Sequence, residues 1–228
     1  MAGGGFIMKK IGCFHAHYSN IEHIERALKD VKVELIHFVD PGLDRRKQDE
    51  RFTLEQAERK VEESLGWIAG SHVDAVLVTC TFFTALWDEE RHRLPVPIVK
   101  IDDPLFRVLA KQNKPVLFVF TNPATVDGTM KQFQAYAERH GASVQAAAAV
   151  LPGTFELIMR GKKEEYFNEV TAGLMRMAEE NPDTAIVAAQ LSMAPAAQYV
   201  ENMTASAIGN SLVSLAGYMQ EKLGLDTK

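Results

Sequence analysis

Short apolar runs rich in β-branched residues alternate with longer stretches of helical periodicity along most of the chain. This alternation is typical of a parallel β-sheet covered by helices, and it limits the fold class more than any other feature of the sequence. The predicted strands are Ile11–His15, Val33–Val39, Ala75–Cys80, Ile98–Ile101, Val116–Phe120, Val144–Val150 and Ala185–Ala189. The predicted helices are Ile21–Asp30, Leu54–Ala69, Pro104–Lys111, Val126–His140, Lys163–Glu180 and Ala205–Lys222. The sequence therefore predicts an α/β protein.

The two halves of the chain resemble each other. Three pairs of matching positions are 105, 111 and 110 residues apart, namely Lys9 and Lys114, Pro41 and Pro152, and Cys80 and Gln190. Strands and helices alternate in any α/β chain, so a loose repeat of the pattern is expected without duplication. A Pro-Gly pair after the second strand of each half nevertheless favours duplication. We expect two similar parallel-sheet subdomains, each a βαβαβ unit. Their expected residues are 9–103 with 196–228 for the first and 104–195 for the second, after a flexible leader at 1–8.

Duplication predicts where a ligand binds. Ligands of parallel sheets bind at the carboxyl ends of the strands, so two facing sheets would enclose a site in the cleft between them. The segments expected there are 15–20, Asp40, 80–83, 122–125, 151–154 and 190–193. The final helix should return to the first half, with a buried stripe of Ile208, Leu212, Leu215 and Met219.

Composition and missing motifs exclude several classes of function. A net charge of −5 argues against a nucleic-acid-binding protein, which usually has a basic face. No apolar run reaches the roughly 18 residues of a membrane span. Two cysteines are few for a secreted protein of this size, so we expect reduced thiols and a cytoplasmic location. The glycine-rich nucleotide motifs and the G-x-S-x-G elbow are absent, and no cofactor is expected.

Cys80 is the first candidate for chemistry. It ends an apolar strand, and a helix or turn that begins after it would direct free backbone N–H groups toward the cleft. Such a position lowers the pKa of a thiol, and the thiolate would serve as a base or a nucleophile. The alternative is a buried structural cysteine, which behaves as a small apolar residue. Position alone does not decide between the two.

Cys13, His15 and His17 alternate along the first strand and share one face if the strand extends that far. His15 or His17 could orient or protonate Cys80. They could also bind a metal with His37 or Asp40, but this set is thin beside the three or four ligands of a usual site, and no metal is expected. For His37, a core histidine with satisfied hydrogen bonds is the simpler interpretation.

Polar residues also follow the first strand of the second half. Thr121, Asn122 and Thr125 could donate hydrogen bonds to a substrate carboxylate. They could equally cap the helix that follows, and the two roles are compatible.

The segments above resemble the aspartate/glutamate racemase superfamily, which includes glutamate, aspartate and hydantoin racemases, maleate isomerase and arylmalonate decarboxylase. The similar segments are 11–16 for the first strand, 78–81 for the first catalytic cysteine, 121–125 for the carboxylate loop and 189–194 for the second cysteine. The resemblance implies an anionic small-molecule pocket with Cys80 and His15 as catalytic residues. The substrate-binding residues it implies are His17, Ser19, Asn20, Thr81, Phe82, Asn122, Thr125, Gln190, Leu191 and Ser192.

The chain differs from this family at the position of the second cysteine. Gln190 occupies that position here, or Leu191 if the alignment with the family is shifted by one residue. Two-base racemases need a proton-transferring group on each face of the α-carbon, and a carboxamide does not serve as one. We therefore expect one-sided proton transfer with little racemisation.

The predicted function is a cofactor-independent isomerase or lyase that acts on a small carboxylate or carbonyl compound through Cys80. A non-catalytic small-anion-binding protein and a Cys/His hydrolase that forms a thioester remain as alternatives. We also expect a homo-oligomer, most simply a dimer, because apolar residues gather after Cys80 at Phe82, Phe83, Leu86 and Trp87.

Overall fold

A computed structural model describes residues 8–46, 49–87, 91–112, 114–204 and 206–228. The expected leader, residues 1–8, lies outside this part of the chain except for Met8. The chain divides into two compact units. The first is Met1–Ile101 with Ala216–Lys228, and the second is Asp102–Leu215.

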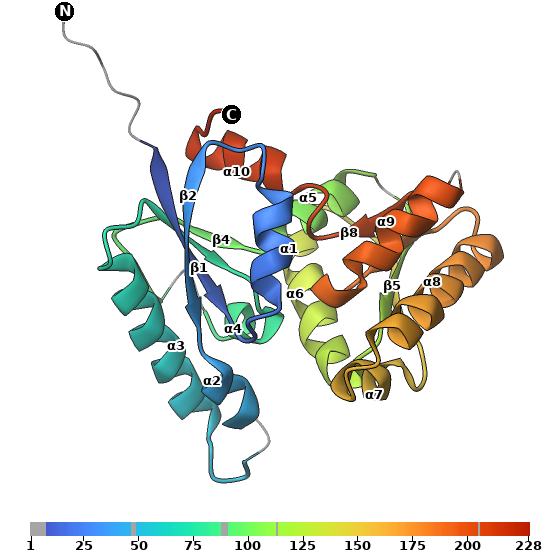
Figure 1. Ribbon diagram of the computed structural model, residues 1–228, viewed down its shortest axis with the longest axis horizontal. Coiled ribbons are helices and arrows are strands. Elements are labelled where there is room, and N and C mark those ends of the chain that lie inside the picture. The colour runs from blue at the N-terminus through green and yellow to red at the C-terminus, as the bar shows by residue number, and fades with distance from the viewer. Residues whose placement is uncertain (1–7, 47–48, 88–90, 113, 205) are drawn as a thin grey trace, which may run out of the picture. The chain divides into compact units, whose positions relative to one another are not determined.

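The first unit contains a four-stranded parallel sheet with the strand order β2-β1-β3-β4 (Figure 1). Its strands are β1 (Lys9–His15), β2 (Val33–Val39), β3 (Ala75–Val78) and β4 (Ile98–Lys100). Its helices are α1 (Asn20–Ala27), α2 (Pro41–Arg46), α3 (Leu54–Ala69), α4 (Thr81–Ala85) and the last helix α10 (Leu215–Leu223). In the register of β1 and β2, Cys13 lies opposite His37.

Alternation of side chains along β1 divides the residues between the two faces of this sheet. Phe14 packs in a core cluster with Val61, Leu65 and Ile68 of α3. Gly12 lies against the same helix, because a Cβ atom there would be 2.5 Å from Cγ2 of Ile68. Figure 1 shows α1 and α3 on opposite sides of β1 and β2. The residues that alternate with Phe14 therefore face α1.

The second unit contains another four-stranded parallel sheet, in the order β6-β5-β7-β8. Its strands are β5 (Val116–Phe120), β6 (Ala146–Val150), β7 (Ala185–Ala188) and β8 (Ile208–Asn210). Its α-helices are α5 (Asp103–Gln112), α6 (Val126–Arg139), α7 (Thr154–Met159), α8 (Lys163–Glu180) and α9 (Ala194–Met203). Its 3-10 helices are η1 (Pro123–Thr125) and η2 (Leu191–Met193). One core cluster joins the sheet to α8 and α9, and another joins it to α5 and α6.

The two sheets have the same topology. In each, the first strand lies between the second and the third, and the fourth pairs with the third. The α/β class and the duplicated parallel-sheet arrangement are thus confirmed. Among the described residues, no helix is both long enough and apolar enough to cross a membrane.

The end of the chain differs from the prediction. Residues 205–222 do not form one helix, because Ile208–Asn210 forms β8 and pairs with β7. Residues 196–215 accordingly belong to the second unit rather than the first. The expected stripe is split, with Ile208 buried in the second unit and Met219 buried in α10. The last helix does pack on the first unit, where Lys222 Nζ donates to the carbonyl of Ile98 at 3.0 Å.

Candidate active site

Cys80 lies two residues beyond the end of β3 and directly before α4. Its backbone is extended, with φ −116° and ψ 118°, and its carbonyl accepts the N–H of Thr84 at 3.0 Å. The side chain is half-buried and the thiol is free of any disulfide. The expectation that a helix begins immediately after Cys80 is confirmed.

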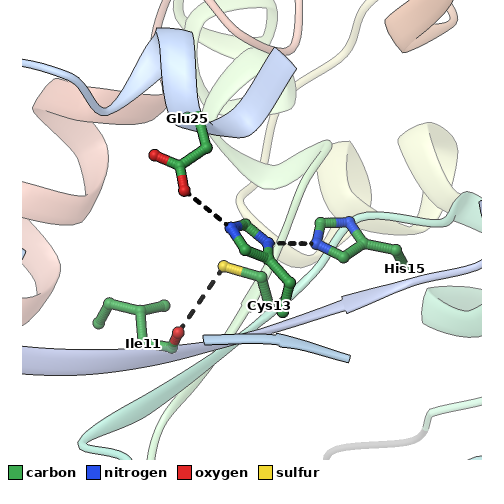
Figure 2. Close-up of polar contacts among 5 residues, drawn as sticks. Ile11, Cys13, His15 and Glu25 are labelled. Carbon is green, nitrogen blue, oxygen red and sulfur yellow. Dashed lines mark hydrogen bonds and ion pairs between the residues drawn. The ribbon is translucent and has the colours of Figure 1, made fainter. Parts of the chain in front are cut away.

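His15 is the last residue of β1 and is fully buried. Its Nδ1 is 2.8 Å from Oγ1 of Thr79, the residue before Cys80, and its Nε2 is 2.8 Å from Nδ1 of His37. His37 Nε2 lies 3.1 Å from Oε1 of Glu25 on α1. Figure 2 shows the part of this series of contacts that runs between Glu25 and His15. The pKa of His15 is lowered to about 4, mainly by burial and to a smaller extent by the neighbouring His37. The ring of His15 is therefore neutral at pH 7.

Cys13 lies on the same face of the sheet as His15. Burial raises the pKa of the Cys13 thiol to about 12, with a smaller contribution from the charge of Glu25. The ligand atoms of Cys13, His15 and His37 all lie within 4.8 Å of one another. Asp40, the other metal ligand considered from the sequence, instead caps α2, because its Oδ1 accepts the N–H of Gly42 at 2.9 Å.

The turn after β1 holds three of the predicted substrate-binding residues. The strand ends at His15, so His17 does not continue its face, which corrects the expected alternation. His17 and Ser19 are exposed and contact each other, with 2.7 Å between Nδ1 and Oγ. Asn20 begins α1, and its Nδ2 donates to Oγ1 of Thr79 at 3.4 Å. Of the three, Asn20 alone joins the contacts around Thr79.

Gln190 occupies the place in the second unit that Cys80 occupies in the first. Each lies two residues beyond the third strand of its sheet and directly before a helical segment, which is η2 for Gln190. Leu191 lies one residue further along, so the equivalent of Cys80 is Gln190.

The side-chain oxygen of Gln190 accepts three hydrogen bonds. The donors are the N–H of Thr121 at 2.7 Å, the hydroxyl of Thr121 at 2.7 Å and the N–H of Asn122 at 3.0 Å. A carboxylate oxygen would accept the same three donors. The other polar groups of this loop satisfy each other. Asn122 Oδ1 accepts the N–H of Ala124, and the hydroxyl of Thr125 donates to the carbonyl of Asn122.

Sequence reasoning missed Tyr166, a buried residue of α8. Its hydroxyl lies 2.8 Å from Oγ of Ser192 and 3.4 Å from Oγ1 of Thr121. Burial raises the pKa of the Tyr166 phenol, although its hydrogen bonds with Ser192 and Thr121 act in the opposite direction. A single tyrosine in a helical pattern gives no sequence signal for this contact.

The aromatic cluster after Cys80 is part of the core. Phe83, Leu86 and Trp87 are buried, and Phe82 is half-buried. Thr81, also half-buried, is the first residue of α4. These side chains pack within the first unit, and only the half-buried Phe82 keeps part of its surface exposed. The dimer stays a prediction.

The sequence matches no family model and no curated protein. Solved structures match over almost the whole chain. The aspartate racemase of Picrophilus torridus has a TM-score of 0.68 at 10% identity and covers 96% of both chains. An aspartate racemase homologue from Pyrococcus horikoshii has a TM-score of 0.69 at 12% identity over 95% of this chain and 100% of that chain. Allantoin racemase from Klebsiella pneumoniae has a TM-score of 0.65 at 16% identity over 96% of this chain and 90% of that chain. The chain thus has the fold of the racemases that the motifs around Cys80 and Gln190 resemble.

Proposed function

We propose that the protein is a cofactor-independent isomerase or lyase, and that Cys80 transfers a proton on one face of a small carboxylate or carbonyl compound. The observation that carries the proposal is the contrast between two equivalent positions. A thiol follows the third strand of the first sheet, and a carboxamide follows the third strand of the second. A thiolate accepts and returns a proton near neutral pH, whereas a carboxamide does not.

The contacts of His15 support a positioning role for it rather than the role of the base. Both ring nitrogens have partners, and the low pKa of the ring keeps it neutral at pH 7. Thr79 contacts Nδ1 of His15. The backbone N–H of Thr79 also donates to the carbonyl of Phe14 at 3.0 Å, which fixes Thr79 against β1. His15 would therefore fix the segment that leads into Cys80.

The substrate class is inferred from the similar structures. They include racemases of aspartate and allantoin. These compounds share a carbon-bound hydrogen made acidic by an adjacent carboxyl or carbonyl group. Proton transfer at such a carbon is the chemistry proposed for Cys80. With one thiol in place of two, the proton leaves and returns on the same face.

Alkylation of the two thiols tests whether Cys80 is activated. In a pH series with iodoacetamide, one thiol should react rapidly well below about pH 8.5, the pKa of an ordinary thiol. This reaction should disappear in Cys80→Ala and persist in the matched control Cys13→Ala, because the Cys13 thiol is buried and its pKa is about 12. Malonates, dicarboxylates or hydantoins that raise the melting temperature should slow it. A Cys80 thiol that reacts only as an ordinary thiol does would contradict the proposal.

A further inference from the structure

Three potential metal ligands share one face of the first sheet beneath α1. Cys13 and His15 are two residues apart on β1, and His37 lies opposite Cys13 in the register of β2. Strands of a covered parallel sheet usually place apolar side chains at such positions. Here a thiol and two imidazoles lie together, with their ligand atoms within 4.8 Å of one another.

Two outer contacts orient the imidazole rings. The carboxylate of Glu25 can accept a hydrogen bond from Nε2–H of His37, at 3.1 Å. The hydroxyl of Thr79 donates to the carbonyl of Phe14 at 3.2 Å, so Oγ1 can accept a hydrogen bond from Nδ1–H of His15. Metal-binding histidines almost always donate their second N–H in this way, which fixes the tautomer.

With both outer nitrogens protonated, the two inner nitrogens present lone pairs to each other. These atoms, Nε2 of His15 and Nδ1 of His37, are 2.8 Å apart. Without a metal, one N–H···N hydrogen bond between the rings accounts for this distance. A metal ion in place of that proton would meet a lone pair from each ring.

We propose that Cys13, His15 and His37 form a binding site for a transition-metal ion of the zinc class. Sulfur and imidazole nitrogen are the ligands that Zn²⁺ prefers, at about 2.3 Å and about 2.0–2.1 Å. The ion would replace the proton between the rings, and the rings would part slightly to admit it. The Cys13 thiol would bind as the thiolate and release its proton to solvent. Nδ1 of His15 would keep its contact with Thr79, so the site is compatible with the proposed function and does not depend on it.

Cobalt substitution tests which thiol binds the ion. Metal-stripped full-length protein should bind one equivalent of Co²⁺ and develop a sulfur-to-cobalt charge-transfer band in the near ultraviolet. The band should disappear in Cys13→Ser and persist in Cys80→Ser, the matched control for the other thiol. A band that follows Cys80 instead, or no saturable binding of one equivalent, would overturn the proposal.

A second comparison does not require a change in the buried core. Glu25→Gln removes the charge that faces His37 and should weaken Zn²⁺ binding about 10- to 100-fold, the usual effect of losing an outer partner. Glu22→Gln, on the same helix but paired with Arg26, should leave the affinity unchanged. Equal effects of the two substitutions in calorimetric titrations with Zn²⁺ would refute a site beneath α1, and far-UV circular dichroism would verify that both variants are folded.

Discussion

Replacing Gln190 by leucine would remove the oxygen on which three donors converge. The Thr121 hydroxyl would retain a partner in Tyr166, at 3.4 Å. The N–H groups of Thr121 and Asn122 would lose theirs. Thr121 is buried, and an unsatisfied buried donor costs about 1–3 kcal/mol. Asn122 is half-buried, so water can replace part of its bond. We therefore expect Gln190→Leu to destabilise the second unit by about 2–3 kcal/mol.

The matched variant is Gln190→Glu, which keeps an oxygen acceptor of similar shape. Its loss should be below about 1 kcal/mol, because charged acceptors form stronger hydrogen bonds. Both tryptophans, Trp67 and Trp87, lie in the first unit, so urea unfolding should be followed by far-UV circular dichroism rather than by tryptophan fluorescence. Hydrogen exchange over residues 116–125 should accelerate in the leucine variant. Equal stability and equal exchange in the two variants would show that the three contacts to Gln190 do not hold the loop.

Two further predictions concern packing and pH. Gly12→Ala should destabilise the first unit by about 1–3 kcal/mol in urea unfolding, because its Cβ would lie 2.5 Å from Cγ2 of Ile68. Gly128→Ala, where nothing lies within 4 Å of the added Cβ, should be neutral or stabilising, and a similar loss at both sites would refute the close approach at Gly12. The raised pKa of Tyr166 implies a contribution to stability that is complete below about pH 10, the pKa in the unfolded chain, and is lost as the pH rises through the folded value. Tyr166→Phe should therefore flatten the alkaline decline of the urea midpoint, and an unchanged decline would contradict this.

The sequence was sufficient to predict most strands and the duplication. Buried parallel strands appear as continuous apolar runs, and their order was repeated in the second half. β8 was missed because its three residues, Ile208–Asn210, include Gly209 and carry no run of apolar residues. Gly209 suits this place because an added Cβ would lie 3.3 Å from side-chain atoms of Leu105 and Val187.

The sequence named the candidate site residues but not their contacts. Cys80 was identified at the end of a strand, His15 by its alternation with Cys13 and His17, and Gln190 as the counterpart of Cys80 in the second half. The meeting of His37 with His15 depends on the register between β1 and β2, which no local pattern specifies. The contact of Gln190 with Thr121 joins residues 69 apart in the chain, so it required the folded sheet.

Exchange in heavy water tests the central claim most directly. The protein would be incubated in deuterium oxide with each enantiomer of a carboxylate or carbonyl compound found by thermal shift. If Cys80 is the single proton-transferring group, deuterium should enter at the acidic carbon with retained configuration, and Cys80→Ala should abolish the exchange. Racemisation at ordinary enzymatic rates, about 10 per second, would show that a second base exists, and binding without exchange would show that the protein is not such an enzyme.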